Sequence, residues 1–121
     1  MKKNIFIENI NGNITSRPPV WFMRQAGRIL PSYLKLKQNY SFDEMMQNKE
    51  LAARVTLLPL DDLGVDAGIL FSDILVIPKA LGLELEFTAK GPKFHNALDE
   101  NIDFENLKFN PQKLDYIYNN I

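Results

Sequence analysis

Two arginines and an aspartate are the residues of this sequence whose types and spacing best fit chemistry on an anionic ligand. Arg24 and Arg28 lie four residues apart in the stretch PPVWFMRQAGRILP, and Asp73 follows a short apolar run in GILFSDIL. Arginine keeps its positive charge at all relevant pH values and can bind a carboxylate through two hydrogen bonds. Gly27 allows a sharp turn or a close approach of the backbone to a ligand. The pattern favours a substrate that carries several carboxylates.

Each of these residues also has a structural interpretation. An Arg-x-x-x-Arg pair commonly forms an exposed charged face or surface salt bridges. An aspartate after a buried strand commonly caps a helix or a turn. The only histidine, His95, fits a surface residue, and the methionines fit core packing better than ligation. On spacing alone, the chain is part of an α/β protein with a site for an anionic ligand.

The elements that must position the two clusters alternate between strand and helix. Residues 20–22 and 67–71 are apolar, β-prone runs, and a continuous apolar run is typical of a strand buried on both faces of a parallel sheet. Between them, a helix and loop are expected over 31–42 and a longer helix over 42–60. Strand, helix and strand in this order predict a right-handed βαβ unit. Polar residues after two neighbouring parallel strands would then share one site.

Local signals place the ends of the helices. Ser41 and Asn48 can each cap the start of a helix, and Leu63-Gly64 ends the helical stretch. A short amphipathic helix and a polar turn are expected within residues 1–17. After Asp73 we expect a short helix or turn, a β-prone segment over 83–87 and a loop over AKGPKF. Residues 111–121 predict an interrupted helix that starts at a proline.

Composition excludes several classes of function. The 121 residues carry 14 basic and 15 acidic side chains, which gives no basic excess for nucleic-acid binding. The absence of cysteine excludes disulfides and thiolate metal sites, and a single histidine excludes a multi-histidine metal cluster. No apolar stretch approaches the roughly 20 residues of a membrane span. The start MKKNIFIENI lacks the apolar core of a secretory signal, so a cytoplasmic location is expected.

The two motifs resemble those of a known family. PVWFMRQAGRILPSY resembles the amino-terminal signature of the uroporphyrinogen decarboxylase family, PVW-x-MRQAGR-x-LP, and ILFSDIL resembles its second signature. Between them, ELAARVTLLPL is similar to the family's connecting helix, and IPKALGLELEF and GPKF continue in register. The resemblance covers about residues 18–94.

The resemblance implies a fold and a reaction. The fold is the TIM (β/α)8 barrel, of which residues 1–121 would be the amino-terminal portion of a single, incomplete domain. The family's enzymes are lyases, usually homodimers, that remove the four acetate carboxylates of uroporphyrinogen III to give coproporphyrinogen III in haem biosynthesis. They use no metal and no organic cofactor.

The resemblance also implies roles for individual residues. Asp73 would accept hydrogen bonds from the pyrrole N–H groups of the substrate, and Arg24 and Arg28 would bind its carboxylates. The backbone of five further residues would line the cleft, namely Gln25, Ala26, Gly27, Phe71 and Ile74. Tyr33 lies where the family often has an aromatic residue. Lys37 aligns with a third basic residue that is often arginine, and lysine keeps the charge but not the bidentate fork.

The length departs from the family. A TIM barrel takes about 250 residues, roughly twice this length. The family's later functional tyrosine and histidine lie in strands that these 121 residues do not contain, so we do not expect them to catalyse the reaction alone. The alternatives are a non-catalytic remnant and a half-barrel that pairs with a separate carboxyl-terminal half. A relative of the corrinoid-binding methyltransferase barrels is disfavoured, because both motifs follow the decarboxylase pattern.

Overall fold

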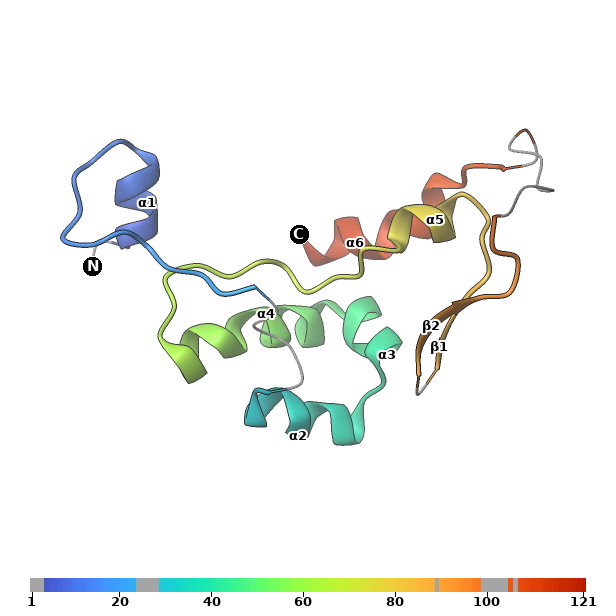
Figure 1. Ribbon diagram of the computed structural model, residues 1–121, viewed down its shortest axis with the longest axis horizontal. Helices are drawn as coiled ribbons and strands as arrows, with labels where there is room; N and C mark the ends of the chain where they lie inside the picture. The colour runs from blue at the N-terminus through green and yellow to red at the C-terminus, as the bar shows by residue number, and fades with distance from the viewer. Residues whose placement is uncertain (1–3, 24–28, 89, 99–104, 106) are drawn as a thin grey trace.

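A computed structural model describes residues 4–23, 29–88, 90–98, 105 and 107–121 (Figure 1). The order of its elements mixes helices with one pair of strands: α1 (Ile5–Ile10), α2 (Pro31–Asn39), α3 (Phe42–Gln47), α4 (Lys49–Leu63), α5 (Val76–Ala80), β1 (Leu85–Thr88), β2 (Gly91–Phe94), the 3₁₀ helix η2 (Pro111–Leu114) and α6 (Asp115–Asn120). This content agrees with the coarse expectation of a protein that contains both helices and strands.

The predicted long helix is two helices with a break at Asn48. Ser41 begins α3 with a capping box, because its hydroxyl accepts from the Glu44 N–H at 3.2 Å and its own N–H donates to the Glu44 carboxylate at 2.7 Å. The Asn48 side chain accepts from the Leu51 N–H at 3.0 Å and so begins α4. Gly64 ends α4 in the left-handed conformation, with φ of 64°. Both predicted caps and the predicted end are confirmed.

The core lies where α2, α3 and α4 meet the chain that follows α4. Met45 and Val55 have no exposed surface, and Phe71 enters the same cluster from the extended segment 64–73. The Phe71 ring lies 5.3 Å from the Phe42 ring and 6.2 Å from the Tyr33 ring, within the usual range for aromatic pairs. The buried members of the cluster are Leu30, Tyr33, Leu36, Met45, Met46, Val55 and Phe71.

Two predicted strands are not strands in the structure. Residues 20–22 and 67–71 are extended but belong to no ladder, so no parallel βαβ unit is present among the described residues. The two segments do run side by side and in the same direction (Figure 1), and the Asp66 N–H donates to the Val20 carbonyl at 2.9 Å. A strand is defined by repeated bonds to its neighbours, and one such bond does not make a ladder.

The prediction of a loop over AKGPKF is wrong from Gly91 onward. Gly91–Phe94 forms β2, which pairs antiparallel with β1 so that Leu85 faces Phe94 and Thr88 faces Gly91. Gly91 has φ of 118°, which a residue with a side chain rarely adopts, and the Thr88 hydroxyl donates to the Gly91 carbonyl at 2.8 Å. The β-prone segment predicted over 83–87 is confirmed as β1, and the turn chemistry of Thr88 and Gly91 explains its partner.

The remaining helices predicted from the sequence are confirmed. The helix predicted within residues 1–17 is α1, and its cap Asn4 accepts from the Phe6 N–H at 2.9 Å. The chain after Asp73 forms the short helix α5. The interrupted helix predicted over 111–121 is η2 followed by α6, with Pro111 in the first turn.

Candidate functional site

Asp73 lies where the extended chain after α4 turns into α5. Its carboxyl group is half-buried, and burial is the main cause that raises its pKa, because a low dielectric disfavours the charged form. The backbone N–H groups of Leu75 and Ile74 and the charge of Lys79 lower the pKa, whereas the carboxylate of Asp43 raises it. The two N–H groups agree with the turn interpretation of Asp73. Its half-buried position also leaves it able to meet a ligand.

Two further titratable groups near Asp73 were not predicted. Tyr116 on α6 is half-buried against the core. Burial is the main cause that raises the pKa of its hydroxyl, and the charges of Asp73 and Asp43 raise it further. In the described part of the chain, the Oδ1 atom of Asp43 is buried and has no hydrogen-bond partner. These residues come from elements far from Asp73 in the sequence, and no local pattern marks them.

Phe71, a predicted cleft residue, directs its ring into the core, where it is only 9% exposed. Its backbone N–H donates to the Thr56 hydroxyl at 2.8 Å, and that hydroxyl donates to the Ala52 carbonyl at 2.7 Å. Gly68 allows this close approach to α4, because a Cβ there would lie 3.1 Å from the Thr56 carbonyl oxygen and from Leu60. Thr56 thus fixes the chain two residues before Asp73.

The other predicted residues lie in different surroundings. Ile74 is 90% exposed, beside the half-buried Asp73. Lys37 is exposed on α2, whereas Tyr33 on the same helix is buried, and burial raises the pKa of the Tyr33 hydroxyl. Five predicted residues lie outside the described residues, namely Arg24, Gln25, Ala26, Gly27 and Arg28. Phe71, Asp73 and Ile74 are therefore near one another only because they follow closely along one segment.

A salt bridge joins the two segments that lead to the predicted site residues. The guanidinium of Arg17 donates to both carboxylate oxygens of Asp66, at 2.6 and 2.8 Å, and the Val20 N–H donates to the same carboxylate at 2.8 Å. These bonds hold the pKa of Asp66 below its ordinary value, and the bond from the Arg17 side chain has the largest effect. The Asp66 side chain is only 11% exposed, whereas that of Arg17 is 52% exposed.

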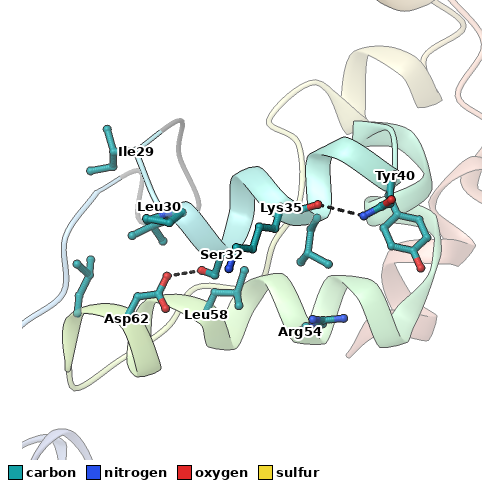
Figure 2. Close-up of a pocket in the computed structure, with 12 residues that line it drawn as sticks. Ile29, Leu30, Ser32, Lys35, Tyr40, Arg54, Leu58 and Asp62 are labelled. Carbon is teal, nitrogen blue, oxygen red and sulfur yellow. Dashed lines mark hydrogen bonds between the residues drawn. The ribbon is translucent and has the colours of Figure 1, made fainter.

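A groove of about 820 Å³ lies between α2 and α4 (Figure 2). Ser32 on α2 points toward Asp62 on α4 and donates a hydrogen bond to its carboxylate. Lys35 and Arg54 also line the groove, over an apolar floor that includes Leu58. Of the predicted site residues that the structure describes, none lines this groove.

His95 is exposed, and its Nε2 atom lies 2.8 Å from a carboxylate oxygen of Glu86. The expectation of a surface histidine is confirmed. In the part of the chain that the structure covers, no three His, Asp or Glu side chains are grouped to hold a metal ion. Within that same part, none of the helices combines the length and the apolarity that crossing a bilayer requires.

The described part is thus a mixed helix-and-strand unit that presents a half-buried carboxyl group at the end of an extended segment. The pattern of the uroporphyrinogen decarboxylase (URO-D) family matches residues 1–121, and the chain belongs to this family. The resemblance that the two motifs carry is confirmed over the whole chain.

Three relatives illustrate how far the similarity extends. The uroporphyrinogen decarboxylase of Thermodesulfovibrio yellowstonii is 46% identical over 121 residues, covering 98% of this chain and 36% of the relative. That of Hydrogenobaculum sp. is 49% identical over 110 residues, 89% of this chain and 30% of the relative. That of Helicobacter pylori is 47% identical over 120 residues, 97% of this chain and 35% of the relative. The chain spans about a third of the length of these relatives.

Proposed function

We propose that the whole protein is a uroporphyrinogen decarboxylase, a carboxy-lyase that converts uroporphyrinogen III to coproporphyrinogen III by removing four acetate carboxylates. The observation that carries this proposal is the match of the family pattern to all 121 residues, with relatives of that name at 41–49% identity. The residues of this chain would supply one part of the site. The fold that we infer for the whole protein is the family's TIM barrel, with this chain as its amino-terminal portion.

Asp73 would act on the pyrrole N–H groups of the substrate. Loss of carbon dioxide requires that the electron pair of the breaking C–C bond enter an electron-poor group, and a protonated pyrrole ring can accept it. The ring carries a positive charge before that bond breaks, and a fixed carboxylate beside the N–H groups stabilises this charge. The half-burial of Asp73 supports the role, because a charge interaction is stronger where water is partly excluded.

The arginines would hold the substrate while the bond breaks. Arg24 and Arg28 have the charge and the two-pronged geometry to bind its carboxylates. The backbone of Gln25, Ala26, Gly27, Phe71 and Ile74 would line the cleft. Lys37 is the weakest of the proposed contacts, because it is exposed on α2 and lysine offers no fork. A homodimer and a cytoplasmic location stay predictions.

A fusion enzyme tests this proposal. The 121 residues would replace the matching part of the Thermodesulfovibrio yellowstonii relative, and the coproporphyrinogen formed would be oxidised and measured by its fluorescence. We expect activity from the fusion, and a loss of about 10²–10³-fold in kcat for Asp73→Asn, the scale of removing one well-placed transition-state contact. Asp61→Asn, an exposed aspartate on α4, is the matched control. Near-normal turnover of the Asp73→Asn fusion would contradict the role of Asp73.

A second candidate is a half-barrel that functions only with a separate polypeptide. The exposed apolar side chains on the two extended segments indicate a contact with further protein, which this candidate places on a separate polypeptide: Trp21 and Phe22 on one segment and Ile69 on the other are 38%, 57% and 63% exposed. Such a surface is typical of a contact with another piece of protein. Mixing the chain with a polypeptide that carries the remaining two thirds of the same relative would restore activity. The candidate is rejected when the mixture is no more active than either piece.

A further inference from the structure

The Arg17–Asp66 salt bridge is the best-formed polar contact between distant parts of the described chain. Three N–H donors converge on one carboxylate, two from Arg17 and one from the Val20 backbone. The Asp66 N–H returns a bond to the Val20 carbonyl at 2.9 Å, so that Val20 and Asp66 are joined in both directions. A bidentate arginine with a further backbone donor has far more defined geometry than an ordinary surface ion pair.

This contact fixes one extended segment against another. The segment after α4 is attached independently to the core, through Val65, Phe71 and the Thr56 hydroxyl. The described residues of segment 17–23 contribute no member to the buried core cluster, and Val20, Trp21, Phe22 and Met23 are 37%, 38%, 57% and 77% exposed. The hydrogen bonds at Val20 and Asp66 are the directional contacts that define its register along the neighbouring segment.

Along the sequence, the two segments precede the two groups of residues proposed for the site. The segments run in the same direction (Figure 1), one from Arg17 to Met23 and the other from Gly64 to Asp73. A shift by one residue along an extended chain moves every following residue by about 3.3 Å. Such a shift would change the distance from Asp73 to Phe22 and Met23.

We propose that Arg17 and Asp66 are positioning residues that fix the register of the segment 17–23 against the segment 64–73, and with it the spacing between Met23 and Asp73. The part of this inference that concerns the site rests on the proposed function. The part that concerns the register rests on the hydrogen bonds alone, so the two can fail separately.

The register is measured first. Because the chain has no cysteine, Phe22→Cys and Ile69→Cys place the only two thiols for spin labels, both at exposed positions. We expect a narrow distribution of label distances, and a distribution about twice as wide, or a shifted mean, after Asp66→Ala or Arg17→Ala. Arg17→Lys keeps the charge with a single donor group, and it should give an intermediate width.

Two controls separate register from general loss of structure. Asp61→Ala removes an exposed aspartate of α4 and should leave the distances at 22 and 69 unchanged. A second label pair at Leu34 and Leu57, exposed residues of α2 and α4, should stay narrow in the Asp66→Ala chain. An unchanged distribution at 22 and 69 in the Asp66→Ala and Arg17→Ala chains overturns the proposal, as does an equal broadening of both label pairs.

The link to the site is measured with uroporphyrin, the oxidised and fluorescent form of the proposed substrate. Titration of the fusion enzyme should give a Kd that rises about tenfold in the Asp66→Ala variant, because misplaced groups lose binding steeply, and that stays constant in the Asp61→Ala variant. Broadened distances with an unchanged Kd overturn the positioning role. A wild-type fusion that does not bind uroporphyrin counts against the proposed function, while the label distances still decide the register.

Discussion

The helical pair α3–α4 and the two extended segments are built on different principles. The helices make their own backbone hydrogen bonds, begin at side-chain caps and bury Met45 and Val55 completely. The extended segments make few backbone bonds, and they are held by side-chain bonds, between Arg17 and Asp66 of the two segments and from Phe71 to Thr56 of α4. A helix is therefore specified by its local sequence, whereas an extended segment depends on whatever lies beside it.

Phe71 is where the two regions meet, and its loss should have the largest effect. Phe71→Ala removes a ring that contacts Phe42 and Tyr33, and we expect a loss of about 3–5 kcal/mol in the free energy of unfolding. Urea denaturation followed by circular dichroism measures it. Ile74→Ala, at a residue that is 90% exposed, should change stability by no more than about 0.5 kcal/mol. Equal effects of the two substitutions would mean that Phe71 does not join the regions.

The Thr56 hydroxyl should come next, because it serves both regions at once. Thr56→Val keeps the shape but removes the acceptor of the Phe71 N–H, and an unpaired amide in a partly buried position costs about 1–3 kcal/mol. Thr56→Ser keeps the hydroxyl and should retain most of the stability. The single tryptophan, Trp21, reports on the other extended segment by fluorescence. If Thr56→Val is as stable as the wild type, the bond to Phe71 does not hold the segment.

The cap at Ser41 tests the helical region alone. Ser41→Ala removes the acceptor of the Glu44 N–H, and we expect a cost of about 1 kcal/mol. Ser41→Thr keeps an acceptor at the cap and should cost less. Spin labels at positions 22 and 69 should keep their distance in the Ser41→Ala chain, which would confirm that the two regions are positioned independently. A broadened distance would show that they are coupled.

The smallest effects are the pH dependences of the two aspartates, and they have opposite signs. The pKa of Asp73 is raised in the folded state, because burial favours the protonated carboxyl group. The stability that goes with this protonated form is present at low pH and is lost as the pH rises through the folded-state pKa. Asp73→Asn should therefore raise the melting temperature at neutral pH and have little effect in acid. The lowered pKa of Asp66 means that its contribution is present at neutral pH and lost as the pH falls.

Asp66→Asn should accordingly lower the melting temperature at neutral pH and flatten its decline in acid. Thermal melts of both variants between pH 3 and pH 8, about the range in which carboxylates titrate, provide the test. If both variants changed the melting temperature at neutral pH in the same direction, the prediction would be wrong. Burial would then not dominate the pKa of Asp73, or the salt bridge would not dominate the pKa of Asp66.

Prediction from the sequence succeeded for the helices and failed for the strand pairing. The caps at Ser41 and Asn48 and the end at Gly64 were predicted, because each depends on a few neighbouring residues. The strand predicted over 67–71 is an extended segment without a ladder, since pairing depends on a neighbour that no local pattern supplies. Gly91–Phe94 was predicted as loop for the same reason, and it became a strand through its pairing with β1.

Some residues of the candidate site were predicted from the sequence, and others were found only in the structure. The motifs around Arg24 and Asp73 predicted the family, because the residue types and their order lie in the sequence itself. Asp43 and Tyr116, whose charge and hydroxyl lie near Asp73, were missed, since they come from α3 and α6. The Arg17–Asp66 salt bridge joins residues that neither motif contains.

The sequence by itself determined the family, the residue types of the proposed site and the ends of the helices, because each of these is encoded by residues close together in the chain. Only the tertiary structure decided that Phe71 enters the core, that Asp73 is half-buried beside Asp43, and that Arg17 meets Asp66. Burial and long-range hydrogen bonds depend on which segments come together in space. A local pattern of residue types does not specify that choice.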